Sequence, residues 1–303
     1  KGVEALYPSG KREVFTADNP PQRQIVLDNI NTITGDNLGR IWIGSAGGIN
    51  VWDTQKQKMY TITANFDLNK GLRSNYISAF ITPPDGSFWV GTWGGGMYKA
   101  KGNFLNVDEI YFEYVANFNT NIYSADDKIW LKHDKKVYNI DLSTMHVDLD
   151  SVLNKAIGQK EISSLLVATN QEVWLGLNNQ VLQYNPHTGK VKLIDVLTGK
   201  PCNISNLVED FDGNIWGTSL TSIFRYSIHD EQIESFPMKR GIPLDIFLSQ
   251  SNTRSKSGEL FFGGNDGFIS FNPDDIRKNM FSPQLVISGI RVNNKEINSV
   301  NEL

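Results

Sequence analysis

Few residues of this chain occur in patterns that support catalysis. The histidines occur singly, without the spacing of a metal site: His133, His146, His187 and His229. No Gly-x-Ser-x-Gly elbow, phosphate-binding loop or Cys/His pattern is present. We therefore expect no catalytic residue, no metal and no cofactor. A two-carboxylate site stays open as an alternative, because the chain has 33 carboxylates and the adjacent Glu209 and Asp210 are of the kind that a lyase or glycosidase uses.

Residues suited to carbohydrate binding occur instead in turns and links. Trp93 lies beside three glycines and could stack on a sugar face, or it could pack against neighbouring structure. Arg73 could hold a carboxylate or sulfate in a bidentate contact, or be an ordinary surface arginine. His133, between Lys132 and Asp134, could bind a ligand or belong to a solvated turn. We predict a ligand site drawn from Trp93, Arg73, Lys132, His133, Tyr123, Asn178 and Arg254.

The elements that must position these residues belong to an internal repeat. Aromatic anchors recur at intervals of 47, 41, 44, 42 and 45 residues, at Trp42, Trp89, Trp130, Trp174, Trp216 and Phe261. A period near 44 residues with four short strands in each unit is typical of a β-propeller. Because the anchors recur so regularly, we interpret their tryptophans as structural wedges between blades and not as sugar-stacking residues.

The repeat predicts an all-β fold, a β-propeller of four-stranded blades. Six blades carry the anchor motif, and residues 1–17 form the outer half of another blade, whose inner two strands would lie before residue 1. This arrangement favours seven blades; six blades, with residues 11–17 completing the last one, is the alternative. We predict an N-terminally truncated propeller over residues 1–278 and the start of a C-terminal Ig-like β-sandwich over residues 279–303.

Propeller geometry places the predicted ligand residues on one face. The turns between second and third strands and the links between blades share this face, which is the mouth of the central channel. The Asp-Gly turns, such as Asp85-Gly86 and Asp212-Gly213, lie on the other face. The turn at residues 92–96 is one residue longer than its equivalents, which singles out Trp93.

Composition narrows the class of protein. A chain of 303 residues with 40% apolar residues can form a full core. The net charge of −4 does not favour binding to a nucleic acid. The single cysteine excludes an internal disulfide. No run of eighteen apolar residues exists, so we expect no transmembrane helix within the chain.

The repeat resembles the two-component-regulator propeller repeat, most closely over residues 74–92 and 204–216. Residues 282–295 resemble the start of the three-tyrosine β-sandwich that follows such propellers in the periplasmic sensor regions of Bacteroidetes hybrid two-component systems. The chain departs from the pattern at Lys132 and Thr218, where other copies have glycine, and its third and fourth copies lack the Asp-Gly turn.

The resemblance implies a non-catalytic sensor module in the periplasmic part of an inner-membrane protein. It would bind a glycan-derived oligosaccharide and relay binding to a histidine kinase through a membrane helix outside this chain. The implied protein partner is a second copy, joined through the C-terminal sandwich. Two alternatives stay open: a propeller enzyme, either a lyase or a glycosidase, and a scaffold propeller whose ligand site lies on another domain.

Overall fold

The computed structural model describes residues 2–7, 9–65, 70–119, 123–196, 203–220, 222–237, 244 and 246–276, together with strands at 290–292 and 295–297. For residues 124, 125, 237, 290–292 and 295–297, only the backbone is described. The predicted domain boundary at residues 278 and 279 lies outside the described residues. So do Asn69, Lys239 and Arg240, which we expect in links between blades at the mouth face, and Thr221, which we expect in a turn of that face.

Each of the six repeats forms its own antiparallel sheet. The first two blades consist of β3 (Ile30–Gly35), β4 (Arg40–Ser45), β5 (Gly48–Asp53), β6 (Lys58–Ile62), β7 (Ile77–Ile81), β8 (Trp89–Thr92), β9 (Gly96–Gly102) and β10 (Ile110–Ala116). The third and fourth consist of β11 (Tyr123–Ala125), β12 (Lys128–His133), β13 (Lys136–Asp141), β14 (Val147–Leu149), β15 (Ser164–Val167), β16 (Val173–Gly176), β17 (Gln180–Asn185) and β18 (Lys190–Asp195).

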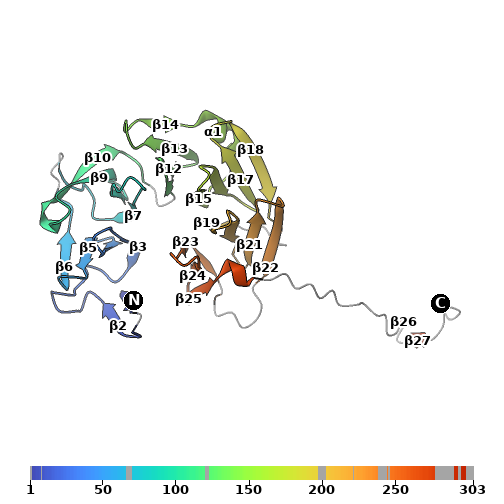
Figure 1. Cartoon of the computed structure of the whole chain (residues 1–303), viewed down its shortest axis with the longest axis horizontal. Coiled ribbons are helices and arrows are strands. Elements are labelled where there is room, and N and C mark those ends of the chain that lie inside the picture. Colours follow the sequence, from blue (N-terminus) through green and yellow to red (C-terminus); the bar gives the residue numbers. More distant parts are fainter. Residues whose placement is uncertain are drawn as a thin grey trace.

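The last two blades differ in their described strands. The fifth blade is four-stranded, with β19 (Asn206–Glu209), β20 (Ile215–Thr218), β21 (Ser222–Ser227) and β22 (Gln232–Pro237). The described residues of the sixth blade form three strands, β23 (Phe247–Arg254), β24 (Leu260–Gly264) and β25 (Gly267–Phe271). The blades surround a common centre, with the first strand of each blade innermost (Figure 1). The predicted β-propeller is thereby confirmed.

The N-terminal residues form a separate two-stranded sheet of β1 (Val3–Leu6) and β2 (Arg12–Phe15). The six-blade alternative needs residues 11–17 to extend the last blade. In the structure β2 pairs with β1 and not with β25, so residues 11–17 do not complete the last blade. This hairpin packs on the first blade, where the rings of Phe15 and Trp52 lie 4.9 Å apart. A second antiparallel pair consists of β26 (Ile290–Val292) and β27 (Lys295–Ile297).

The core lies between neighbouring blades. Each anchor tryptophan belongs to the apolar cluster that joins its own sheet to the next one, and all five are buried: Trp42, Trp89, Trp130, Trp174 and Trp216. Burying an aromatic side chain of this size is a large stabilising contribution. Their interpretation as wedges between blades is therefore confirmed.

The turns between first and second strands follow the predicted chemistry. The backbone of Gly39, Gly86 and Gly213 has φ values of 76°, 78° and 79°, a region in which glycine pays no steric penalty. The helix α1 (Ser151–Ile157) interrupts the all-β pattern between the third and fourth blades. Its first turn is capped by the Asp150 side chain, and Leu153 and Ile157 pack into the core. Short 3-10 helices occupy Val107–Glu109 and Pro273–Asp275.

Candidate ligand-binding channel

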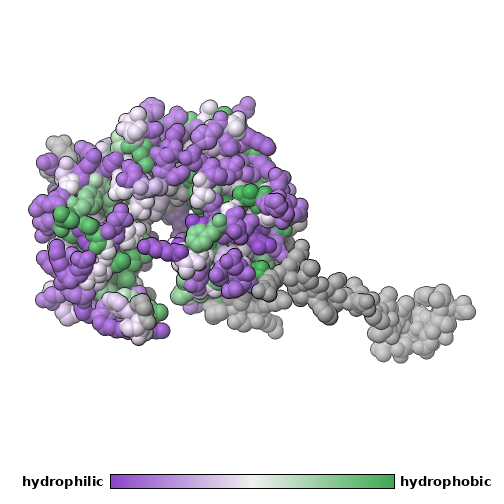
Figure 2. All heavy atoms as spheres, in the orientation of Figure 1, coloured by the Kyte–Doolittle hydropathy of each residue, from purple (hydrophilic) through white to green (hydrophobic). Residues whose placement is uncertain are grey.

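A cavity of about 760 Å³ occupies the centre of the ring. It is lined by residues of the innermost strands β3, β7, β11, β15, β19 and β23, and by β24 and β25 of the last blade. Figure 2 shows this region as a hollow in the middle of the molecule. Its volume lies within the range of about 300–1,000 Å³ typical of small-molecule sites.

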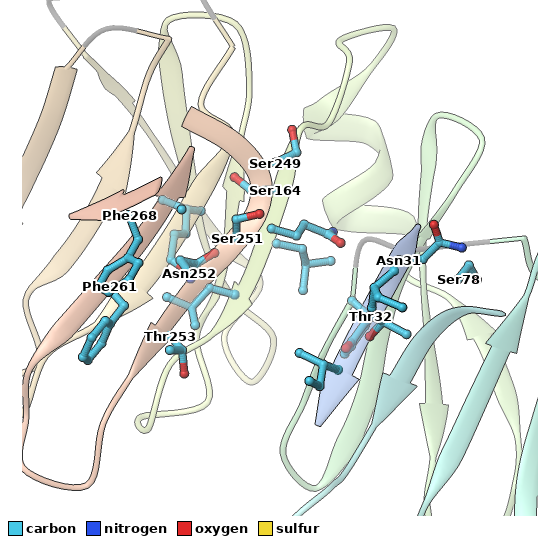
Figure 3. Close-up of a pocket in the computed structure, with 18 residues that line it drawn as sticks. Asn31, Thr32, Ser78, Ser164, Ser249, Ser251, Asn252, Thr253, Phe261 and Phe268 are labelled. Atoms are coloured by element: carbon cyan, nitrogen blue, oxygen red, sulfur yellow. The ribbon is translucent and has the colours of Figure 1, made fainter. Parts of the chain in front are cut away.

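Small hydroxyl and amide side chains dominate the polar lining. Figure 3 shows those of β23 on one side of the cavity and those of β3 and β7 on the other. The polar set is Asn31, Thr32, Ser78, Tyr123, Ser164, Ser249, Gln250, Ser251, Asn252 and Thr253. Such groups both donate and accept hydrogen bonds without carrying charge. The cavity is therefore suited to a ligand that is rich in neutral hydroxyl groups.

Irregularities in three inner strands help to direct these side chains. The pairing register shifts between Ile30 and Thr32, between Ile77 and Ala79, and between Phe247 and Asn252. In the last of these, Gln250 adopts a φ of 58°, which is uncommon for a residue other than glycine. Bulges of this kind re-aim side chains and often occur next to functional sites.

The lining residues that the structure describes carry no charged side chain. Among these described residues there is no Asp, Glu, Lys, Arg or His, and Tyr123 is the only group that can titrate. Burial raises the pKa of Tyr123 to about 12, so its phenol stays neutral at physiological pH. General acid–base catalysis needs a group that exchanges protons near the working pH. The channel lining in the described part of the chain offers no such group.

Some of the polar lining also joins neighbouring blades. The Asn31 side chain donates to the carbonyl of Ile77 at 2.9 Å, and the Ser164 hydroxyl donates to the carbonyl of Ile204 at 2.7 Å. The Asn252 amide donates to the carbonyl of Leu207 at 2.9 Å. These bonds fix the side chains in place, so the cavity wall is preorganised before any ligand enters.

Tyr123 is the one predicted ligand residue that lines this cavity. Its hydroxyl donates a short hydrogen bond to the carbonyl of Phe80 in the neighbouring blade. A phenol oxygen held in this way can still accept a hydrogen bond from a ligand. The predicted ligand residues other than Tyr123 lie outside the lining.

Trp93 and Arg73 lie in the second blade, at its mouth face. The turn of Trp93 is held by its backbone, whose N–H donates to the carbonyl of Tyr76 at 2.8 Å. Trp93 is 60% exposed, so most of its surface does not pack against neighbouring structure. The guanidinium of Arg73 lies 4.2 Å from the centre of the Tyr114 ring, in a cation–π contact.

His133 is more than part of a solvated turn. Its imidazole packs edge-on against the buried Phe118 ring at 5.2 Å, and its Nε2 lies 3.9 Å from the carboxylate of Asp134. The neighbouring Lys132 is half-buried. In the fourth blade, Asn178 is exposed and forms an isolated backbone bridge with Asn203.

The prediction that Arg254 belongs to the mouth face is wrong. Arg254 is the last residue of β23, next to the turn between the first and second strands of its blade, and so lies on the opposite face. Its guanidinium donates to the carbonyl of Glu209 at 2.6 Å and covers the Phe211 ring at 4.6 Å. These contacts join the fifth and sixth blades.

The two adjacent carboxylates have structural partners. Glu209 accepts hydrogen bonds from the backbone N–H and the hydroxyl of Thr169, both at 2.8 Å. Asp210 accepts from the indole N–H of Trp216 at 2.8 Å and from the side chain of Asn214 at 3.0 Å. Both groups therefore join elements of the fold, as the recurring acidic position of the repeat suggests. No cluster of three metal-ligating side chains occurs among the described residues.

Most residues of the channel lining were not among the predicted ligand residues. The predicted residues came from turns and links, whereas the polar lining comes chiefly from the inner strands. The available signal was the run Ser249-Gln-Ser-Asn-Thr253, an unusually polar stretch for a strand at the centre of a propeller.

Among the described residues, no helix combines the length and apolar character needed to cross a membrane.

Comparison with known proteins places this geometry in context. No protein-family model matches the chain. The chain is 21% identical over 312 residues to histidine kinase P4 of Formosa agariphila, a match that covers 98% of this chain and 22% of the kinase. Among solved structures, the extracellular domain of the hybrid two component system BT4673 from B. thetaiotaomicron matches with a TM-score of 0.64 and 18% identity, over 82% of this chain and 32% of that one.

Two further solved structures show the range of the fold. The extracellular domain of BT3049, also a hybrid two component system of B. thetaiotaomicron, matches with a TM-score of 0.55 and 19% identity, over 93% of this chain and 45% of that one. Virginiamycin B lyase from Staphylococcus aureus matches with a TM-score of 0.62 and 11% identity, over 88% of this chain and 86% of that one. The resemblance to hybrid two-component systems is confirmed, and the chain spans less than half the length of the histidine kinase and of the two hybrid-system domains.

Proposed function

We propose that this chain is a non-catalytic sensor propeller that binds a neutral oligosaccharide in its central channel. The observation that carries the proposal is the channel lining, whose described residues offer hydroxyl and amide groups and no charged side chain. A sugar presents the matching hydroxyl groups, and the cavity volume suits a short oligosaccharide. Trp93, exposed at the mouth face, offers a ring on which a further sugar residue could stack.

The similarity to extracellular domains of hybrid two-component systems and to a histidine kinase supports the sensor role. In this proposal the propeller lies in the periplasm and passes ligand binding to a kinase through parts of the protein outside this chain. Dimerisation through a C-terminal β-sandwich would supply the relay. The proposed role requires differential affinity of the ligand for two states of the sensor.

A lyase function is compatible with the fold, but the described channel lining offers no general acid or base for it. Virginiamycin B lyase matches most of this chain, yet at 11% identity the likeness concerns the fold alone. A lyase or glycosidase needs a general acid or base in contact with its substrate. The described lining of this channel provides hydrogen-bonding groups without one.

Thermal unfolding in the presence of neutral trisaccharides, with sulfated ones for comparison, tests the proposal. A ligand at about a hundred times its dissociation constant stabilises the folded state by roughly 2.7 kcal/mol. We expect Thr32→Val with Thr253→Val to abolish the shift, because valine keeps the shape of threonine and removes the hydroxyl. Thr63→Val, outside the cavity lining, is the matched control.

The variant Trp93→Ala tests the contribution of the channel mouth to sugar binding separately from that of the channel interior. If Trp93 stacks on the sugar, this variant weakens binding without removing it. A thermal shift that survives both the double threonine variant and Trp93→Ala would contradict the proposal. It would show that the sugar binds at a site other than the channel and its mouth.

A further inference from the structure

The central cavity is open on one side, between the sixth blade and the N-terminal hairpin. Each of the first five blades contributes only its inner strand to the cavity lining, whereas the sixth also contributes Phe261 and Gly263 of β24 and Phe268 of β25. In the described part of the chain the sixth sheet ends at β25, and β1 and β2 form a sheet of their own. These two parts lie apart in the ring (Figure 1), and Figure 2 shows the hollow continuing between them.

The hairpin has the geometry of the third and fourth strands of a blade. Gly48 and Gly96 open the third strands of the first two blades with φ values of 128° and 93°, and Gly2 precedes β1 with a φ of 99°. At all three glycines a Cβ would collide with the carbonyl oxygen of the last residue of the fourth strand, so only glycine fits. The colliding pairs are Gly2 with Phe15, Gly48 with Ile62 and Gly96 with Ala116. By this criterion β1 and β2 are the outer half of a blade.

The inner edge of β1 is open. A complete blade pairs its third strand on both sides, as β5 pairs with β4 and β6. Among the described strands β1 pairs with β2 alone. The N–H of Tyr7 donates to the carbonyl of Lys11 at 2.9 Å, and the alternation of an antiparallel ladder then turns the backbone groups of Glu4 and Leu6 to the open edge. Such an edge is a template for a further strand.

The first blade carries an apolar surface on its side of the opening. In the other five blades the residue before the anchor is buried against the preceding blade. These residues are Phe88, Ile129, Val173, Ile215 and Leu260. Ile41 holds the same position in the first blade and is only partly buried, and Ile33 of β3 is 53% exposed. The hairpin therefore covers the outer part of this blade and leaves its inner strands uncovered.

The sixth blade carries an apolar surface on the other side. Phe261 holds its anchor position but is only partly buried, and Phe268 is 65% exposed. The opening thus combines two apolar faces with a free strand edge. A sugar would match neither feature. A β-strand can pair with the backbone of β1 while its side chains cover both apolar faces.

The turn at Gly2 indicates where such strands would come from. Gly48 pairs with Ser45, the last residue of β4, and Gly96 pairs with Thr92, the last residue of β8. A second strand therefore ends directly before this glycine in the sequence. By the same geometry, the strand that pairs with β1 would be joined to it through Gly2.

We propose that this opening is the docking site of a β-hairpin from the part of this protein that precedes Lys1. Its second strand pairs with the open edge of β1, its side chains pack on Ile41 and Phe261, and its first strand closes the wall of the central cavity. The match to this chain covers only 22% of the histidine kinase and 32% of the BT4673 domain, so these relatives have polypeptide beyond this region. The proposal holds whether or not the channel binds a sugar.

Amide hydrogen exchange in two versions of the protein tests this proposal. One is the 303-residue chain, and the other extends it by the roughly 25 residues before Lys1, about the inner half of a blade of 40–45 residues. We expect the amides of Glu4 and Leu6 to exchange at least about a hundredfold more slowly in the longer protein. The amide of Val14 is the internal control, because the same alternation turns it to the outer edge of β2, and its exchange should be equal in both.

Phe268→Ser and Phe211→Ser form a matched pair of variants, at phenylalanines that are 65% and 67% exposed. In the longer protein, Phe268→Ser removes a contact of the docked hairpin and should speed the exchange of Glu4 and Leu6 at least about tenfold. Phe211→Ser, in a turn of the fifth blade, should not change it. Neither variant should alter these rates in the 303-residue chain, which shows that both retain the fold.

Three results would overturn the proposal. The first is equal exchange of Glu4 and Leu6 in the two versions of the protein. The second is protection of these amides in the 303-residue chain that rises with protein concentration, because a second copy would then cover the opening. The third is protection in the longer protein that Phe268→Ser leaves unchanged.

Discussion

The fifth and sixth blades place the same repeat position in different surroundings. Trp216 of the fifth blade lies between the rings of Phe236 and Phe271, at 5.8 and 5.1 Å, and is fully enclosed. Phe261 of the sixth blade contacts Phe268 at 5.8 Å and lines the central channel, and Phe268 is 65% exposed. The repeat fixes where an anchor lies in its own sheet, whereas the following sheet decides whether it is buried.

The hydrogen bond of the anchor indole also varies between blades. In the first and fifth blades the acceptor is the aspartate six residues earlier, and in the second blade it is the Ser87 hydroxyl. In the fourth blade Ala168 occupies the aspartate position, and the Trp174 indole nitrogen is buried without a partner. The blades thus share packing, while the polar partner of the anchor is less uniform.

If the following sheet decides how strongly an anchor is buried, the largest loss of stability should occur at the enclosed anchor Trp216. Trp216→Ala removes a fully buried side chain between two blades and should lower the free energy of unfolding by about 3–5 kcal/mol. Urea denaturation followed by circular dichroism measures this change. Trp93→Ala is the control. Because Trp93 is exposed, its loss should change the free energy of unfolding by less than about 0.5 kcal/mol. Similar losses in the two variants would contradict the structural role of the anchor.

The next largest effect on stability is expected at Asp36, whose carboxylate accepts the hydrogen bond of the Trp42 indole in the first blade. Burial alone raises the pKa of Asp36, but hydrogen bonds from Trp42 and Arg40 outweigh it and lower the pKa below its ordinary value. Asp36→Asn removes the charged acceptor and should cost about 1.5–3 kcal/mol at neutral pH.

This cost should depend on pH in a defined direction. Because the folded-state pKa of Asp36 is lowered, its contribution is complete above its unfolded pKa of about 3.9 and is lost as the pH falls through the folded value. The difference in unfolding free energy between the protein and Asp36→Asn should therefore shrink below about pH 4. Urea denaturation at a series of pH values measures it, and a difference that grows towards acid pH would contradict the assignment.

A smaller, stabilising effect is expected in the fourth blade. Its turn matches that of the fifth blade, because the backbone bonds from Ala168 to Glu172 and from Asp210 to Asn214 are equivalent, at 2.9 and 3.0 Å. Ala168→Asp combined with Glu172→Asn reproduces the polar corner of the fifth blade and provides an acceptor for Trp174. We expect a gain of about 1 kcal/mol in the free energy of unfolding.

Each single variant serves as a control for this pair. Ala168→Asp alone brings two carboxylates together, and Glu172→Asn alone leaves the indole nitrogen without a partner. Thermal unfolding of all three variants isolates the new hydrogen bond. A double variant no more stable than either single one would show that the fourth blade cannot adopt the corner of the fifth.

The sequence predicted the parts of the molecule that depend on periodicity. The anchor spacing identified the blades and the burial of the tryptophans, because a buried aromatic must recur once in each repeat. The channel lining escaped prediction, because serine, threonine and asparagine carry no spacing signal and register shifts in β3, β7 and β23 alter which residues point inward. The helix at Ser151–Ile157 is too short to show a helical period.

Arg254 and Arg40 show a second limit of the sequence. Each has its role because of a carbonyl in a neighbouring blade, Glu209 for Arg254 and Phe104 for Arg40. Contacts between residues 45 and 64 positions apart depend on how blades stack, which the local pattern does not encode. Tyr123 was predicted as a ligand residue in a link between blades, whereas in the structure it begins the inner strand β11 and lines the channel.

The smallest expected effect is at the sixth anchor and tests the comparison most directly. Phe261→Ala removes the contact with Phe268 but no wedge between two described blades, so we expect a loss of only about 0.5 kcal/mol, the lower end for an aromatic pair. Urea denaturation alongside Trp216→Ala gives the ratio of the two losses. A loss at Phe261 as large as that at Trp216 would mean that another sheet covers this face in solution, so that the sixth anchor is a wedge like the other five. A small loss would leave Phe261 as part of the channel wall, where its ring can contact a ligand.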